Sequence, residues 1–260
     1  MSALFRFALR LFPRPLLIRV SQWLYPLIDL WYRGKGFTDP INGKSYRKFL
    51  PYGYQKQRPN VLSPGTLSLE RHRLLWLYFN RETDFFDRAA DVLHIAPEQA
   101  FLKPFQQLNH RSYITSDLNS PLADVQADIC NLPFSDQQFD WVICNHVLEH
   151  IPNDEIAMQE IYRVLKLRGT AILQVPLRLD QKTYEDERIT DPKERARVFG
   201  QYDHVRIYGK DYQNRLEQVG FTVKMLAYAE QLTLEEQTRY AVPTNEIIPV
   251  CTKGNRTKEI

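Results

Sequence analysis

Cysteine and glycine are both scarce in this chain of 260 residues, which contains three cysteines and ten glycines. Cys130, Cys144 and Cys251 are far apart and odd in number, which excludes a disulfide framework or a cysteine metal cluster and favours a reducing compartment. A G-x-G-x-x-G sequence is absent, which argues against NAD binding. A G-x4-G-K-[ST] loop is absent as well, which excludes a P-loop nucleotide hydrolase.

Long apolar runs are also missing. No stretch of about 18 charge-free apolar residues occurs, so an ordinary transmembrane span is excluded. A cleaved signal peptide fits poorly, because arginines interrupt the first apolar segment and no small-residue cleavage site follows. Disorder is excluded as the main state, since 14 Phe, 14 Tyr and 4 Trp must pack somewhere. The length suggests one large domain, or one domain with a small appendage.

The net charge of +3 hides an asymmetry along the chain. Residues 1–60 carry 11 Lys/Arg and 2 Asp/Glu, whereas the other 200 residues carry 23 and 29. A mildly acidic body repels phosphate, so nucleic acid is an unlikely partner, whereas a basic N-terminal segment can contact an anionic surface.

Residues 1–33 are expected to form an amphipathic N-terminal arm. Apolar side chains recur there at helical spacing, and prolines divide the segment into short pieces; the apolar residues are Leu16, Val20, Trp23, Leu24, Leu27 and Trp31. Such an arm can lie at a membrane interface with its arginines on phosphates. The alternative, that it packs on the protein's own body, stays open. We therefore expect a cytoplasmic protein, with peripheral attachment at the inner face of the membrane as an open possibility.

Residues 34–69 are rich in Gly, Pro, Asn and Ser, which favours a compact, loop-rich module. Two turns, at 39–43 and 63–66, repeat the C-x2-C spacing of a zinc ribbon but contain no cysteine. Taken alone, they read as ordinary turns.

From Ala89 onward, apolar runs alternate with amphipathic stretches. Strands are expected at 92–95, 113–115, 139–144, 170–175, 222–226 and 247–251, and helices at 69–79, 100–108, 154–165, 192–199 and 211–219. This alternation predicts an α/β fold with a mostly parallel sheet covered on both faces. Ligands of such sheets bind beyond the carboxyl ends of the strands.

Two acidic residues are spaced as a nucleoside site requires. Asp117 follows the second strand, about 20 residues after the first, where a carboxylate can accept both ribose hydroxyls. Asp128 precedes Leu132-Pro133-Phe134, where it can take the exocyclic amine of adenine. Each residue by itself can equally be a helix cap or turn former.

The segment from Asp128 to Gly169 resembles class I S-adenosylmethionine-dependent methyltransferases, in particular the type 11 group. The matching residues are Leu132-Pro133-Phe134-Ser135-Asp136, Phe139-Asp140, Asn145-His146-Val147-Leu148-Glu149-His150-Ile151 and Arg163-Val164-Leu165-Lys166. The resemblance covers about residues 89–227. It implies a Rossmann-like, mostly parallel seven-stranded sheet in residues 70–260 and S-adenosyl-L-methionine as the cofactor.

The first motif departs from that group, because His94, Ala96, Glu98 and Ala100 stand where an acidic residue and a G-x-G-x-G run are usual. A bacterial subgroup with L-H-x-A-P-E there is similar. By this resemblance His94, Ala96 and Glu98 flank the methionine part of the cofactor, and Asn145 lines the cleft. Asp117 binds the ribose, and Asp128 with Ile129 binds the adenine.

The same subgroup is similar in Arg47-Lys48-Phe49-Leu50-Pro51-Tyr52-Gly53 and Ser68-Leu69-Glu70-Arg71-His72-Arg73. It carries cysteines at the positions of Asp39, Asn42, Ser63 and Thr66. We interpret residues 34–69 as a zinc-ribbon-like module that has lost its ligands, and we expect no metal.

The segment after the expected strand at 139–144 contains candidates to orient or deprotonate an acceptor, namely His146, Glu149 and His150. A purely structural role for them stays open. Asp203, His204, Arg206 and Tyr208 can bind an anionic or hydroxylated acceptor, or can form a salt-bridged loop. The predicted function is methyl transfer to a small, or glycan- or lipid-linked, acceptor. The alternative is a non-catalytic interaction protein that kept the fold.

Overall fold

The computed structural model describes residues 26–53, 57–121 and 123–254. By internal contacts the chain divides into two compact units. The N-terminal unit contains residues 1–76 and 233–243, and the sheet unit contains residues 77–232 and 244–260. The boundaries predicted from the sequence, at residues 33 and 69, stay a prediction.

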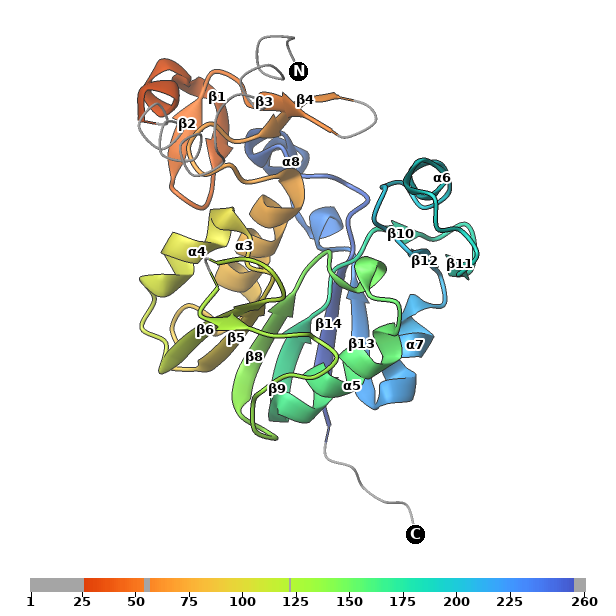
Figure 1. Cartoon of the computed structure of the whole chain (residues 1–260). Helices are drawn as coiled ribbons and strands as arrows, with labels where there is room; N and C mark the ends of the chain where they lie inside the picture. Colours follow the sequence, from red (N-terminus) through yellow and green to blue (C-terminus); the bar gives the residue numbers. More distant parts are fainter. Residues whose placement is uncertain (1–25, 54–56, 122, 255–260) are drawn as a thin grey trace. The chain divides into compact units, whose positions relative to one another are not determined.

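A seven-stranded sheet forms the centre of the sheet unit (Figure 1). Its order is β13-β14-β9-β8-β5-β6-β7, and only β14 runs against its neighbours. The strands are β5 Asp91–Ile95, β6 Ser112–Asp117, β7 Val125–Gln126, β8 Phe139–Cys144, β9 Leu165–Ile172, β13 Phe221–Leu226 and β14 Ile248–Lys253. The predicted Rossmann-like, mostly parallel seven-stranded sheet is confirmed.

Helices cover both faces of this sheet, as consecutive residues of β8 demonstrate. Side chains alternate between the two faces along a strand. Trp141 meets Phe79 of α3 (Glu70–Glu82) at a ring-centroid distance of 5.8 Å, in a cluster that also holds Phe105 of α4 (Gln99–Gln106). Val142 instead belongs to the core cluster that contains residues of α5 (Asp154–Val164) and α7 (Tyr212–Val219).

The sequence-based element bounds differ from the structure in a few places. β9 begins at Leu165 rather than at 170, because the chain enters the strand directly after the last turn of α5. The predicted strand end at 175 is also wrong, since the strand ends at Ile172. β7 has two residues and no periodicity that a sequence could reveal.

An insertion between β9 and α7 forms a small sheet of its own, with the order β10-β12-β11. Its elements are β10 Leu177–Arg178, β11 Tyr184–Glu185, α6 Pro192–Val198 and β12 Arg206–Gly209. The predicted helix at 192–199 is present as α6, and the Asp191 side chain caps its first turn by accepting from two backbone N–H groups.

Two hairpins build the N-terminal unit, one of β1 (Arg33–Asp39) and β2 (Lys44–Tyr46), the other of β3 (Leu50–Tyr52) and β4 (Arg58–Leu62). The turns that follow β1 and β4 are joined by side chains, because the hydroxyls of Thr66 and Ser68 both donate to the buried carboxylate of Asp39. The origin of this module as a zinc ribbon stays a prediction.

Arg73 at the start of α3 organises the N-terminal unit. It is fully buried, and its guanidinium donates to the backbone oxygens of Val61, Ser68, Tyr240 and Ala241 at 2.7 to 2.9 Å. The last two lie at the end of α8 (Leu234–Tyr240). Burial lowers the pKa of Arg73 to about 10, so the group stays charged at neutral pH.

Most of the predicted amphipathic arm, residues 1–25, lies outside the described residues. Residues 26–31 are helical, with Leu27, Leu30 and Trp31 exposed. Among the residues that the structure describes, no helix is both long enough and apolar enough to cross a membrane.

Candidate active site

Four parallel strands end at one edge of the sheet and bring the predicted site residues there. β5 leads into the loop that contains Ala96 and Glu98, and β6 ends at Asp117. β8 is followed by Asn145 and His146. The backbone N–H of His146 donates to the carbonyl of Gln174, a residue that follows the end of β9. The separation of these residues in the sequence is therefore no guide to their proximity, as expected for a parallel sheet.

Glu98 joins the loops after β5 and β8. Its Oε2 lies 2.6 Å from His94 Nε2, and its Oε1 accepts a 3.0 Å hydrogen bond from Asn145 Nδ2. The other ring nitrogen of His94 lies 2.8 Å from the Tyr113 hydroxyl on β6. Burial raises the pKa of Tyr113, which therefore keeps its proton. The structure thus brings His94, Glu98 and Asn145 together, and their role in binding the cofactor stays a prediction.

Ala96 adopts φ +47°, in the left-handed region that favours glycine. Its N–H donates to the Ser116 carbonyl at 2.7 Å, which fixes the loop against β6. The loop therefore keeps the backbone conformation that a glycine would adopt, although the residue carries a Cβ.

Asp117 ends β6 and is half-buried. Its Oδ1 accepts from the N–H groups of Asn119 and Ser120 at 2.8 and 2.7 Å, whereas Oδ2 receives no hydrogen bond from the described residues. Asp128 is exposed and accepts from Cys130 N–H, and Ile129 beside it is buried. Both carboxylates thus form turns, each through its Oδ1.

Glu149 lies in η1 (Leu148–His150), directly after β8, and is 1% exposed. Neither carboxylate oxygen accepts a hydrogen bond of ordinary geometry from the residues that the structure describes, and His146 Nδ1 lies 3.4 Å from Oε1. Burial raises the pKa of Glu149, but the attraction of His146 and His150 outweighs it, so this pKa lies below its ordinary value. The site therefore holds a buried carboxylate ion.

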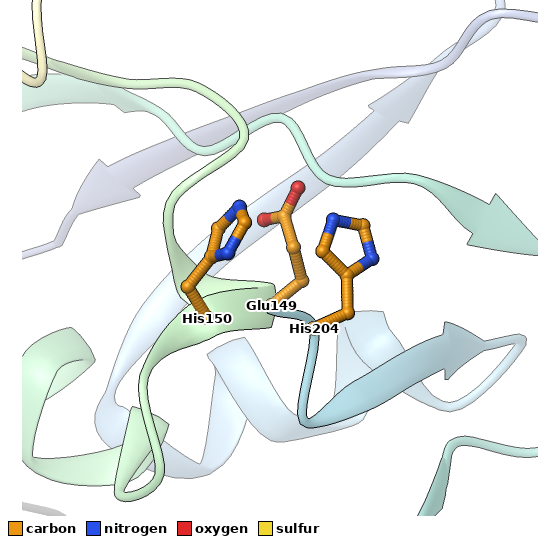
Figure 2. Close-up of side chains that lie close together, drawn as sticks. All are labelled: Glu149, His150 and His204. Atoms are coloured by element: carbon orange, nitrogen blue, oxygen red, sulfur yellow. The ribbon is translucent and has the colours of Figure 1, made fainter. Parts of the chain in front are cut away.

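Asp203 and His204 precede β12 and lie against η1, as Figure 2 shows for His204. The rings of His150 and His204 meet edge to face, with 4.7 Å between centroids. Asp203 Oδ2 lies 3.4 Å from His150 Nδ1. Burial lowers the pKa of His204, although the charge of Glu149 opposes this, so the ring is neutral at pH 7.

Arg206 and Tyr208 are buried and have structural partners. The Arg206 guanidinium donates to the carbonyl groups of Leu148, Ile151 and Pro152 and to the Glu185 carboxylate. Tyr208 donates to Asp154 at 2.6 Å. Both residues thus hold the segment that carries Glu149.

The sequence did not indicate three polar residues that support or border this site. Tyr113 supports His94, and Asp124 binds the N–H and hydroxyl of Thr115 at 2.9 and 2.7 Å. Gln174 is buried, and its side-chain oxygen and nitrogen have no hydrogen-bond partner in the described part of the chain. Gln174 could have been predicted at this edge, because it is a polar residue directly after the apolar run 171–173.

The strand order, with its single reversed strand β14, is that of the class I methyltransferase fold. Residues 81–173 match the protein family described as "Methyltransferase domain". In its fold and in this match, this part of the chain is similar to the class I, S-adenosylmethionine-dependent methyltransferases.

The curated proteins that are similar to this chain match it over short segments. A demethylmenaquinone methyltransferase of Staphylococcus carnosus is 46% identical over 48 residues, which are 18% of this chain and 20% of that protein. A Methanocaldococcus jannaschii protein of unassigned function is 49% identical over 49 residues, or 19% and 21%. The chain thus spans about a fifth of the length of these curated relatives.

Among solved structures, 1,6-didemethyltoxoflavin-N1-methyltransferase of Burkholderia thailandensis, crystallised with S-adenosylhomocysteine, is 15% identical, with a TM-score of 0.43 over 65% of this chain and 72% of that chain. A methyltransferase of Archaeoglobus fulgidus is 14% identical, with a TM-score of 0.45 over 72% and 96%.

Proposed function

We propose that the chain transfers the methyl group of S-adenosyl-L-methionine to an acceptor bound beside Glu149. The observation that carries this proposal is the assembly of Glu98, Asn145, Asp117 and Glu149 at the carboxyl edge of a class I sheet, within the segment that matches the methyltransferase family. Fold and family give the reaction class, and the polar residues at this edge support the site.

The residues present fit this cofactor. Asp117 keeps one carboxylate oxygen available for the ribose hydroxyls, and Asp128 with the apolar Ile129 suits the adenine. Ala96 keeps the left-handed backbone conformation of a glycine loop, and Glu98 with His94 and Asn145 borders the methionine part. When bound, the cofactor supplies a methyl group on a positively charged sulfur, open to in-line displacement.

The acceptor's nucleophilic atom loses its proton as it gains the methyl group, so a proton acceptor is needed when that atom is protonated. Glu149, ionised and without a hydrogen bond of ordinary geometry among the described residues, is suited to take it, with His146 and His150 as orienting or alternative basic groups. Asp203 and His204 are proposed to contact the acceptor. Arg206 and Tyr208 are proposed as positioning residues, because their contacts go to the segment around Glu149.

The polar groups without partners at this site favour an acceptor that carries hydroxyl or similar polar groups, either small or part of a glycan or lipid. Glu149, Gln174 and His204 together offer acceptors and donors for such groups. We further propose that the arm can contact an anionic membrane surface, supported by the exposed Leu27, Leu30 and Trp31 and by the basic excess of residues 1–60.

Titration of the full chain with S-adenosylmethionine and S-adenosylhomocysteine by calorimetry tests the proposal. We expect saturable binding, weakened at least tenfold in Asp117→Ala. Asp180→Ala, another acidic residue but on an exposed turn of the insertion, should bind like the wild type. No heat at millimolar cofactor, or unchanged binding in Asp117→Ala, would contradict the proposed site and favour a non-catalytic protein.

A further inference from the structure

Three side chains from two distant parts of the sheet unit converge beside the proposed acceptor position. Glu149 and His150 come from η1, and His204 comes from the loop before β12 (Figure 2). One potential ligand atom from each, a carboxylate oxygen and two ring nitrogens, lies within 4.8 Å of the others. Figure 2 shows the Glu149 carboxylate between the two imidazole rings.

The hydrogen bond of His204 fixes which of its nitrogens is a ligand. Nδ1 lies 3.2 Å from the carbonyl oxygen of Phe199. A carbonyl only accepts, so Nδ1 carries the proton and the neutral ring has its lone pair on Nε2. Nε2 is buried and has no hydrogen-bond partner within the described ranges. A backbone carbonyl on one imidazole nitrogen with the other nitrogen open is the usual arrangement of a metal-binding histidine.

His150 repeats this arrangement with a carboxylate. Its Nδ1 lies 3.4 Å from Oδ2 of Asp203, which favours the proton on Nδ1 and the lone pair on Nε2. The ring is partly exposed, which leaves an approach from solvent.

The Glu149 carboxylate also has the features of a metal ligand. It is more than nine-tenths buried, and both its oxygens lack a hydrogen bond among the described residues. Among the described residues, its ion-pair contact is His146, whose Nδ1 lies 3.4 Å from Oε1. A buried carboxylate with both oxygens open in this way is suited to bind a cation.

We propose that Glu149, His150 and His204 bind a divalent transition-metal ion. Two imidazoles and one carboxylate form a ligand set suited to such ions, and three protein ligands leave coordination positions open. Metal–ligand bonds of about 2.0–2.2 Å place ligand atoms roughly 3–3.5 Å apart, so modest side-chain rotations complete the site. The sequence predicts no metal, because the positions with zinc-ribbon spacing carry no cysteine and 54 residues separate His150 from His204.

The open coordination positions point to the class of acceptor, an inference that rests on the proposed methyl transfer. An acceptor hydroxyl on the ion would have its pKa lowered, so that it becomes a nucleophile at neutral pH. With Glu149 and His150 on the ion, its proton would pass to His146 or to solvent, and the oxygen would form the new bond to the methyl carbon as the bond from sulfur to that carbon breaks. Hydroxylated acceptors with a second oxygen for chelation are therefore expected.

The direct test uses Co²⁺ alone as the probe, on the untagged full chain after treatment with a chelator. We expect one Co²⁺ per chain, with visible absorption bands that Zn²⁺ abolishes by displacement. Glu149→Gln and His204→Asn should each weaken binding at least tenfold, in keeping with the loss of a ligand. His110→Gln changes a histidine outside the cluster and should bind as the wild type does.

Further measurements separate this site from the proposed methyl transfer and from misfolding. Added Co²⁺ should raise the melting temperature of the wild type but not that of Glu149→Gln. If the variants at the buried positions fail to fold, His150→Ala, at a partly exposed position, replaces them in the Co²⁺ binding measurement. Asp117→Ala should lose cofactor binding and keep Co²⁺ binding. Wild-type protein that binds no more Co²⁺ than Glu149→Gln would overturn the metal site, and normal cofactor binding in the same sample would leave the methyltransferase proposal intact.

Discussion

Glu98 and Asn145, 47 residues apart in the sequence, are joined by a 3.0 Å hydrogen bond that links the loops after β5 and β8. The same carboxylate lies 2.6 Å from His94, which is fully buried. One side chain thereby fixes the two loops that border the proposed cofactor site.

Glu98→Ala is expected to destabilise the protein by about 1–3 kcal/mol, because the buried imidazole of His94 and the amide of Asn145 lose a partner. Cofactor affinity should fall as well. Chemical denaturation and calorimetry measure the two effects. Glu98→Gln, which keeps a donor and an acceptor at the same position, should recover most of the stability; an equal loss in both variants would contradict this reading.

Ala96→Gly should leave stability unchanged or raise it by up to about 1 kcal/mol. Relief of the left-handed conformation is worth about 1–2 kcal/mol, and the added freedom of the unfolded chain costs about 0.5–1 kcal/mol. Ala100→Gly, in the first turn of α4, provides the matched comparison and should cost about 1 kcal/mol or more. Equal destabilisation by both, measured by denaturant unfolding, would show that the positive φ of Ala96 carries no strain.

Arg73→Met should destabilise the N-terminal unit by about 3–5 kcal/mol, because four backbone carbonyl groups lose a buried charged donor. Arg73→Lys should recover little, since one ammonium cannot reach all four oxygens. Arg58→Lys, at an exposed ion pair with Glu70, should change stability by less than about 0.5 kcal/mol. Limited proteolysis followed by mass spectrometry would locate the loss; a stable Arg73→Met unit would refute this role.

Stability should fall as the pH drops below about 6.5, the ordinary pKa of histidine. Burial lowers the pKa of His110 more than the backbone of Arg88 raises it, so the folded protein binds this proton less readily than the unfolded chain does. The resulting stability is fully present above the unfolded pKa and is lost as the pH falls toward the folded pKa.

His110→Phe removes this contribution and keeps the aromatic packing against Phe85, at 4.9 Å between centroids. Thermal melts from pH 8 to pH 5 should show a smaller decrease in the variant. Some decrease should remain, because burial also lowers the pKa of His204. Identical pH profiles would contradict a contribution from His110.

Flotation with lipid vesicles tests whether the N-terminal arm contacts a membrane surface. Trp31 is 74% exposed, and its replacement by alanine should weaken binding to neutral and anionic vesicles alike through loss of apolar insertion. Salt should weaken only the binding to anionic vesicles, since it screens the arginine–phosphate attraction. A chain that begins at Gly34 should bind neither. If that shortened chain instead aggregates and melts earlier while the full chain leaves vesicles untouched, the arm packs on the protein.

Local patterns in the sequence were enough for most strands of the sheet and for the chain positions that follow them. The strand Phe139–Cys144 and the helix from Asp154 have the predicted bounds to within a residue, because a buried apolar run and an amphipathic period are local properties. Asp117 and Asn145 follow such runs, so their place at the carboxyl edge could be predicted before any contact was known.

The environment of the charged groups was decided only by the tertiary structure. Arg206 and Tyr208 alternate with apolar residues as exposed side chains do, yet the insertion buries them against η1. His204 lies beside His150 although 54 residues separate them. The reason is that the segment before β12 packs on η1, where the Val205 N–H donates a hydrogen bond to the Glu149 carbonyl. A sequence specifies which face a side chain takes through local periodicity, but what covers that face depends on long-range packing, and burial then sets the protonation and the available ligand atoms.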